Sequence, residues 1–498
     1  MGVQVEPEYA LIRSRDNWRD KAVSRANENR DRRKTEKRHL KKIAELKRRV
    51  EELEQAARDS KQMPVPADGG IADPGQPAET RALCVLLVVQ AVVSYRSVPR
   101  ILELLDAAMA FGLGWVPHFT SVINWTLRVG LGMLKQVEAV DSPWLAVIDY
   151  SIDIGTKKAL VVLRVGLDAL SKRGGAVRLE DCECIGLKVG EKVNGESVAA
   201  DLEEIFTRAG TPKGIVKDCD ATLRKCVRLW SERQGGPVHV IDDIGHSMAN
   251  ALRDEFEGTA SYERFTALTT QCANLLRQTD LAFLIPPKLR SKGRFQSIGN
   301  LGKWGGRVLD ILAVKGGAKK GSLLARLRGA LPGFLLLKPF ILRFAGTTRL
   351  VSQVMEIIKS QGLGQATYEQ CTRLSEQLPK RSKLKKRLQA WLARHIDIQR
   401  QMTSLPLLVS SDIIESLFGN FKHIIERSPQ ADMNRTVLLI PALCGNLDKT
   451  TIALALNLAS HHNLQMWEQE NIPYTVRKKR QAVLNGNKSQ KAGNVQLE

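Results

Sequence analysis

The chain contains 498 residues, with 75 Lys and Arg against 53 Asp and Glu, which gives a formal net charge of +22 at pH 7. This length exceeds one ordinary hydrophobic core and predicts several domains, while the positive charge favours a polyanionic partner such as nucleic acid. The longest apolar run, residues 82–93, is well short of the ~20 residues of a membrane span, and charges follow Met1 too closely for a secretory signal. We therefore expect a cytoplasmic protein without a membrane partner. The eight cysteines form no CxxC pair, so we expect neither a disulfide framework nor a zinc ribbon.

Residues 1–58 are densely charged, and from Ser14 onward no Gly or Pro interrupts them, so we predict a charged helix. Apolar positions within it alternate spacings of three and four over about two heptads, as in the seam of a coiled coil. These positions are Ile43, Leu46, Val50, Leu53 and Ala57. A dimerising coiled coil and a solvated single helix both remain open. Residues 59–80 are rich in Pro and Gly without periodicity and are predicted to form a linker.

Residues 81–136 return to a helical pattern, with short apolar runs separated by Gly and Pro. Such punctuated helices are typical of a helix-turn-helix DNA-binding domain. Its last helix would then present one polar face to DNA, because four polar positions recur at helical spacing. They are Thr120, Ser121, Asn124 and Arg128. The alternative is a small helical packing domain without a DNA contact.

A block of predicted strands begins at Trp144 and occupies most of residues 137–256. Three strands follow one another, over residues 144–150, 158–167 and 184–189. Strands and helices then alternate, with strands at 214–218 and 237–242 and helices at 197–209, 221–233 and 245–256. This order predicts an α/β fold with a mixed sheet flanked by helices, and it matches the RNase H-like fold.

Residues 257–405 are predicted to be helical and very basic, as a large helical insertion. Three basic runs lie at residues 286–294, 315–320 and 380–387, and they are candidates for contacts to DNA phosphates. In the first run the candidate side chains are Lys288, Arg290, Lys292 and Arg294. Residues 406–470 would complete the core, and residues 471–498 form a basic tail that we expect to be disordered.

Two aspartates each end a predicted strand of the mixed sheet. Asp149 ends the first apolar strand, and Asp218 ends the strand at 214–218. If those strands are neighbours, the two carboxylates meet at one edge, where oxygen ligands suit Mg²⁺ or Mn²⁺. Asp153 is an alternative to the first acid. Asp220 is an alternative to the second, although it could instead cap the following helix.

A third acid is expected from residues 407–422, where a helix starts near Ser411 or Asp412. Glu415 lies in the first turns of that helix. The alternative interpretation of Glu415 is a capping box, with Asp412 as the N-cap and Glu415 at the third helical position. The two strand-end aspartates and the basic chain favour the functional interpretation of Glu415.

Five blocks resemble the transposases of bacterial insertion sequences, which belong to the DDE, retroviral-integrase-like superfamily. The blocks are residues 149–155, 215–220, 243–246, 282–294 and 410–419. The resemblance implies that Asp149, Asp218 and Glu415 bind two Mg²⁺ ions, with Mn²⁺ as a substitute. It also implies that the Asp-x-x-His motif of Asp243 and His246 lies near the site, where a helix N-cap with a structural His is the alternative.

The activity implied by the resemblance is metal-dependent cleavage of double-stranded DNA at the terminal inverted repeats of a mobile element, followed by strand transfer into target DNA. A homodimer in the bacterial cytoplasm, associated with the nucleoid, is implied as well. Two alternatives remain open at this point. The chain could be a DNA-binding regulator that has lost catalysis, or an RNase H-like nuclease that cuts without joining.

Overall fold

The structure is a computed structural model, and it describes most of the chain after residue 76. The described ranges are 77–109, 115–150, 157–173, 176–190, 193–234, 238–288, 298–314, 316–425 and 433–473, with residues 44, 45, 48, 113, 295 and 475. The chain divides into two units, residues 1–70 and 71–498, and the second is described below. The predicted coiled-coil seam, most of the linker and most of the basic tail lie outside the described residues.

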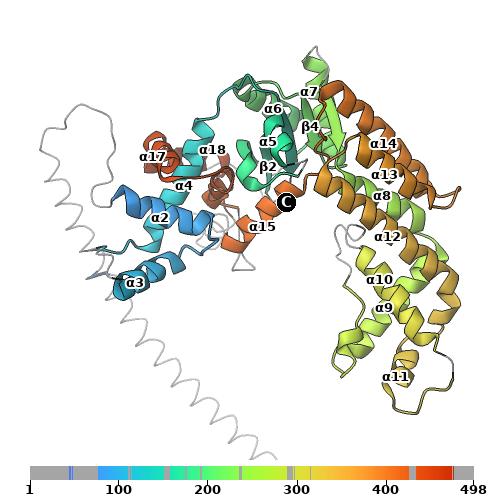
Figure 1. Cartoon of the computed structure of the whole chain (residues 1–498). Coiled ribbons are helices and arrows are strands. Elements are labelled where there is room, and N and C mark those ends of the chain that lie inside the picture. The colour runs from blue at the N-terminus through green and yellow to red at the C-terminus, as the bar shows by residue number, and fades with distance from the viewer. Residues whose placement is uncertain are drawn as a thin grey trace, which may run out of the picture. The chain divides into compact units, whose positions relative to one another are not determined.

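A mixed five-stranded sheet lies at the centre of the second unit (Figure 1). Its strands are β1 (Trp144–Tyr150), β2 (Lys158–Gly166), β3 (Cys182–Gly190), β4 (Gly214–Lys217) and β5 (His239–Asp242), in the order β3-β2-β1-β4-β5. The first three strands are antiparallel, whereas β4 and β5 run parallel to β1. This order and these directions confirm the predicted RNase H-like fold.

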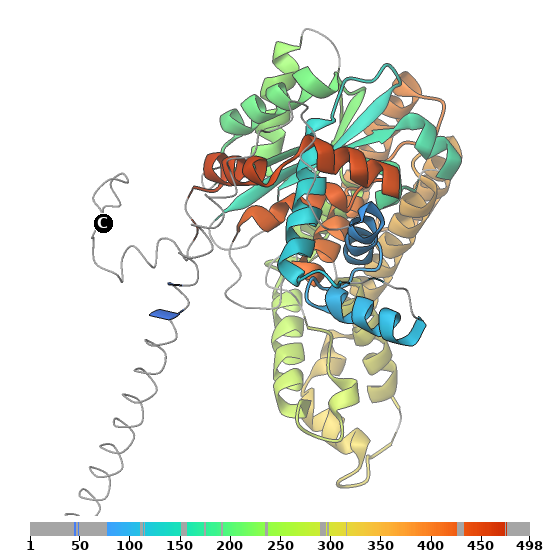
Figure 2. The ribbon, with the colours of Figure 1, turned by 90° about the vertical axis from the view of Figure 1, so that its left-hand side faces the viewer.

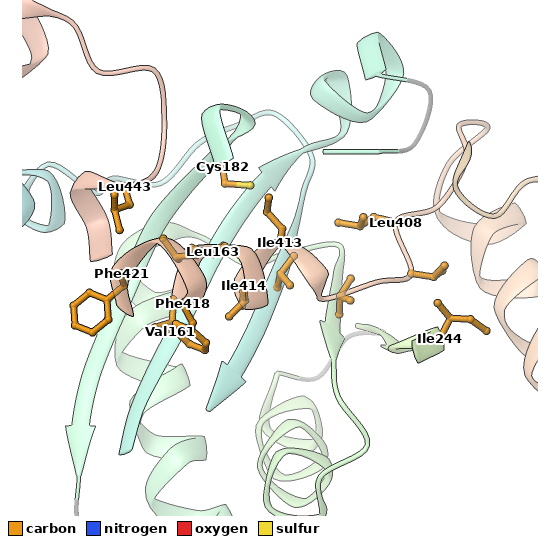
Figure 3. Close-up of a cluster of buried hydrophobic side chains, with 14 of the residues drawn as sticks. Val161, Leu163, Cys182, Ile244, Leu408, Ile413, Ile414, Phe418, Phe421 and Leu443 are labelled. Atoms are coloured by element: carbon orange, nitrogen blue, oxygen red, sulfur yellow. The ribbon is translucent and has the colours of Figure 1, made fainter. Parts of the chain in front are cut away.

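The two faces of the sheet bury different residues because side chains alternate along each strand. Ala146 and Ile148 belong to a core cluster with α6 (Gly195–Ala209) and α7 (Ala221–Arg233). Leu145 and Val147 belong to the opposite cluster, to which α15 (Asp412–Ile425) contributes Ile414 and other side chains. Figure 3 shows α15 crossing this second face near Val161 and Leu163 of β2. Asp149 shares the parity of Leu145 and Val147 and therefore belongs to the face that α15 covers.

The segment between the sheet and α15 is helical, as predicted for residues 257–405. It follows α8 (Ile244–Phe256) and contains α9 (Ala260–Leu276), α10 (Ile298–Leu312), α11 (Leu323–Ala330), α12 (Lys338–Gln361), α13 (Gln365–Glu376) and α14 (Lys383–Met402). Aromatic side chains form its core, where the rings of Phe265, Phe340 and Phe344 lie within 6 Å of one another. Phe256, at the end of α8, packs against the rings of Phe340 and Phe344 and joins this core to the helix that follows β5.

The remaining helices come from the two ends of the unit. They are α2 (Ala78–Val89), α3 (Ser97–Met109), α4 (Phe119–Lys135), the short α5 (Leu167–Arg173), α16 (Leu439–Ala442), α17 (Lys449–Leu458) and α18 (His461–Asn471). Figure 2 shows α4 between α2 and the C-terminal helices. The ideal Cβ position of Gly130 is only 1.7 Å from the Leu438 carbonyl oxygen, so the backbones approach closely there.

The packing of the second half of α4 contradicts the predicted DNA contact of Arg128. From Trp125 to Gly132 every residue of α4 is buried, and the helix contacts α2, α16, α17 and β3. A recognition helix must expose one face to the DNA groove, and the second half of α4 has no such face. The helical periodicity was interpreted correctly, but the packing by C-terminal segments far along the sequence was not foreseen. The alternative, a helical packing element, agrees with the structure.

None of the described helices is by itself both long enough and apolar enough to span a membrane. Among the described helix pairs, one meets the two criteria together, namely α11 and residues 334–361, which are joined across a bend of 65°.

Candidate active site

The carboxyl ends of three parallel strands bring three aspartates to one edge of the sheet. In the register of β1 and β4, Ile148 pairs with Lys217, and in that of β4 and β5, Lys217 pairs with Asp242. The residues one step further on are Asp149, Asp218 and Asp243. The condition of the sequence prediction, that the strands ending at Asp149 and Asp218 are neighbours, is therefore met by the strand order.

Asp243 connects this edge to the helix that carries Glu415. Its Oδ1 accepts the His246 backbone N–H at 2.6 Å, which makes it the N-cap of α8, and lies 3.0 Å from His246 Nδ1. Its Oδ2 accepts the backbone N–H of Ser411 at 2.7 Å and the Ser411 hydroxyl at 3.2 Å. Because Ser411 directly precedes α15, one buried carboxylate fixes the start of both helices.

The capping-box interpretation of Glu415 is wrong in this structure. Asp412 is the first residue of α15, so it is not the N-cap. Its carboxylate forms an ion pair with Lys359 of α12. Among the described residues, no hydrogen bond ties the Glu415 carboxylate to the start of α15. The Glu415 residue is exposed at the surface of α15, although the surrounding chain still removes part of the water around its carboxyl group.

Asp220 is the N-cap of α7, as the alternative interpretation anticipated. Its Oδ1 accepts the backbone N–H groups of Thr222 at 2.7 Å and Leu223 at 3.3 Å. Asp218 is only half-buried, and its Oδ1 accepts the Asp220 N–H at 2.7 Å. Asp153, the alternative to Asp149, lies outside the described residues.

Burial and neighbouring negative charges raise the pKa values of the predicted acids. Burial, together with the smaller effect of the negative charges of Asp218 and Glu415, raises the pKa of Asp149 to about 7. Burial also raises the pKa of Asp218 and of Glu415. Burial lowers the pKa of His246, but its hydrogen bond to Asp243 and the charges of Asp243, Asp218 and Glu415 outweigh burial and bring that pKa to about 9.

This arrangement suits a divalent cation in its chemistry. A group of carboxylates that raise one another's pKa is stabilised by a nearby positive charge, and oxygen ligands are those that Mg²⁺ and Mn²⁺ prefer. The structure brings Asp149, Asp218 and Glu415 to one edge, yet among the described residues no three His, Cys, Asp or Glu side chains stand close enough to hold one ion. Protonated His246 supplies part of the compensating charge.

No family model matches the sequence, and no curated protein matches it. Among solved structures, the chain is similar to the Drosophila P element transposase strand transfer complex, at 11% identity and a TM-score of 0.38. The match covers 83% of this chain and 100% of that one. At this TM-score the likeness supports no inference about function, and the assignment of the fold rests on the strand order of this chain.

One predicted DNA contact, Arg128, is wrong. Its side chain is buried, Nε donates to the Ala459 carbonyl at 2.7 Å, and Nη2 donates to the Leu456 carbonyl at 3.0 Å. The guanidinium therefore satisfies the last carbonyls of α17, which helix geometry leaves without partners, and it cannot reach DNA.

The other predicted DNA contacts stay predictions. Thr120 is exposed at the start of α4, whereas Ser121 and Asn124 are half-buried. Lys288 is exposed. Arg290, Lys292 and Arg294 lie outside the described residues.

Sequence reasoning missed two charged residues at this edge. Lys217 is almost fully buried, and its Nζ donates to Asp242 Oδ1 at 2.6 Å and to the Asp218 carbonyl at 3.3 Å. Lys359 arrives from α12, and its positive charge lowers the pKa of Glu415 against the larger effect of burial. Lys217 could have been found from the sequence, because a lysine inside an apolar strand needs a buried partner. No sequence pattern indicates the position of Lys359.

Proposed function

We propose that the chain is a DNA transposase of the DDE type, which cuts DNA at the ends of a mobile element and joins those ends to target DNA. The observation that supports the proposal is the position of Asp149 and Asp218 at the ends of neighbouring strands in an RNase H-like sheet, with Glu415 on α15, which packs against β1. These acids come from β1, from the end of β4 and from α15, with 197 positions (415 − 218) between the last two. The resemblance of five sequence blocks to insertion-sequence transposases supports the same function.

The three acids are assigned separate tasks in this proposal. Asp149 would contact two Mg²⁺ or Mn²⁺ ions, and Asp218 and Glu415 one each. Two bound metal ions would activate the attacking hydroxyl group and stabilise the leaving oxygen in phosphoryl transfer. Asp243 keeps His246 protonated and fixes the start of α15, so that Glu415 is held at the same edge as the aspartates. No protein side chain needs to act as the nucleophile.

Double-stranded DNA is the proposed partner, as both the element ends and the target. The net charge of +22 favours binding to its phosphates. Lys288 and the basic runs of the helical insertion are candidates for those contacts. A homodimer would bring the two element ends together, and this stays a prediction.

The test is cleavage and joining of labelled duplex DNA that carries the repeats flanking the element, with Mg²⁺ and with EDTA. The wild type is compared with D149N, D218N and E415Q, and with E356Q as the control. Glu356 is an exposed acid of α12 outside the acid cluster, which is the name used here for Asp149, Asp218 and Glu415, so E356Q makes the same chemical change as E415Q elsewhere. We expect the three site variants to lose at least about 100-fold in cleavage while they bind DNA as the wild type does, since the ion ligands are needed for the reaction and not for phosphate contacts.

Three results would contradict parts of this proposal. DNA binding without cleavage by the wild type, in Mg²⁺ and in Mn²⁺, would favour a catalytically silent regulator. Cleavage without any joined product would favour a nuclease of this fold. Cleavage that survives in E415Q at the level of E356Q would remove Glu415 from the site.

A further inference from the structure

The segment that leads into α15 is held at four positions by the end of α12 and the start of α8. The clamp consists of four contacts: Leu407 with Leu363, Val409 with Ile244, Ser411 with Asp243, and Asp412 with Lys359. The first and last contacts come from the end of α12 and the residues just after it. The second and third come from the start of α8. Residues 407–412 are thus fixed between the helical insertion and the catalytic edge.

Lys359 is the member of this clamp that lies nearest to the predicted acids from the side of the insertion. It belongs to the last turn of α12, and its Nζ pairs with Asp412 at the first position of α15. The same Nζ is 3.4 Å from the ideal Cβ position of Gly245, in the first turn of α8. One ammonium group therefore lies at the start of both helices that border the acid cluster.

We propose that Lys359 is a positioning residue, which holds the start of α15 through Asp412 and so keeps Glu415 at the edge with Asp149 and Asp218. This inference rests on the proposed function and deepens it, because it makes the helical insertion part of the catalytic site. The insertion would then do more than bind DNA, since its longest helix sets the position of the third acid.

The main competing role for Lys359 is direct contact with a DNA phosphate, because its side chain is 27% exposed. A charge exchange separates the two roles. In K359D/D412K the ion pair is kept with its partners reversed, while a cation is lost from position 359. The exchange should restore cleavage only if cleavage depends on the ion pair between positions 359 and 412 and not on a cation at position 359.

The experiment uses the full chain with the variants K359M, K359R, K359D and K359D/D412K. K188M is the matched control, because Lys188 of β3 forms an ion pair with Glu204 of α6 and its side chain is 28% exposed. Three quantities are measured: single-turnover cleavage in Mg²⁺, DNA affinity in EDTA, and amide hydrogen exchange of residues 412–416 in metal-free protein. The last two do not depend on catalysis.

We expect K359M to cleave about 10–100-fold more slowly, the usual effect of removing a partner of a metal-binding side chain. Its amides at 412–416 should exchange up to about fivefold faster, because the ion pair no longer holds the helix start. DNA affinity in EDTA should stay within about twofold of the wild type. K359R and K359D/D412K should recover most of the cleavage, and K188M should behave as the wild type.

Two outcomes would overturn the proposal. The first is exchange at 412–416 in K359M that equals exchange in K188M, and this result holds whether or not the protein cleaves DNA. The second is a K359D/D412K variant that cleaves no better than K359D and binds DNA more weakly, which would make Lys359 a phosphate contact. If the wild type itself shows no metal-dependent cleavage, the proposed function fails, and the exchange measurement alone decides the role of Lys359.

Discussion

His395 shows how one buried side chain ties the helical insertion to the sheet. It is fully buried on α14, where its Nε2 accepts the Asp242 backbone N–H at 3.0 Å and its Nδ1 lies 2.7 Å from the Trp391 carbonyl. This pair of bonds requires a neutral ring with the proton on Nδ1, because a protonated ring has no acceptor. Burial accordingly lowers the pKa of His395 to about 4.

The stability of the fold should therefore depend on His395 at mildly acid pH. Below about pH 6.5 the His395 imidazole binds a proton in the unfolded chain but stays neutral in the folded protein. The free energy of unfolding therefore falls by roughly 3 kcal/mol as the pH drops from about 6.5 to about 4. Urea unfolding of the wild type and H395Q measures this effect. The stability advantage of the wild type should shrink across that range, whereas the exposed His461 in an H461Q control should change nothing. An advantage that stays constant with pH would contradict the assignment.

Single site residues could be predicted from the sequence where a charged side chain lies next to an apolar segment. Asp149 and Asp218 stand out because each ends an apolar strand, and a carboxylate there needs a partner. Glu415 could be chosen only by combining it with them, because Asp412-x-x-Glu415 also fits a capping box. Ser411 and Lys359 could not be found, because their roles depend on partners far away in the sequence.

Among the elements, α4 is the one whose packing is most sensitive to a single added methyl group. The Cβ of an alanine at position 130 would lie 1.7 Å from the Leu438 carbonyl oxygen. This oxygen belongs to the backbone, so it cannot move aside as the end of a flexible side chain could. We expect G130A to lower the free energy of unfolding by roughly 1–3 kcal/mol or more, the cost of overpacking a core.

The control for this prediction is G346A in the middle of α12, where the ideal Cβ position has nothing within 4 Å. Because alanine favours helix over glycine by roughly 1 kcal/mol, G346A should be neutral or slightly stabilising. Denaturant unfolding of both variants gives the comparison. If G130A were as stable as G346A, the close approach of α4 to residue 438 would be incorrect.

Helices and strands were more predictable than their neighbours in space. The strand patterns gave β1 and β2 nearly to the residue, since apolar β-branched runs bounded by turn residues are local signals. The packing of α4 depends instead on Leu438 and Ala455, more than 300 positions away, and no local pattern reports such contacts. For that reason Arg128 was assigned to DNA although it caps α17.

For the whole molecule, the strongest expectation concerns salt. Four exposed cations lie at the turn before α14 and in its first turn, and among the described residues none of them has an ion-pair partner. This α14 cation cluster is Lys380, Arg381, Lys383 and Lys386. Unpaired cations grouped in this way are suited to successive DNA phosphates.

The variant K383A/K386A tests the α14 cation cluster. If both lysines contact phosphates, the slope of log affinity against log salt should weaken by about 2, at about 0.9 per contact. K172A/R228A removes the same charge from side chains already paired within α5 and α7 and should leave the slope unchanged. Fluorescence anisotropy with duplex DNA in EDTA gives both slopes. Equal slopes for the two double variants would remove the cluster from the DNA surface.

The clamp around residues 407–412 also determines when a newly made molecule becomes complete. Asp149 and Asp218 leave the ribosome early, but Glu415 follows only after the whole helical insertion, and the partners of α4 come later still. At ~5–20 residues per second, this delay is on the order of ten seconds or more. A chain that stops before residue 412 would carry most of the basic surface and two of the acids, and it would have no third acid. If the proposed function holds, synthesis separates in time the binding of DNA from its cleavage.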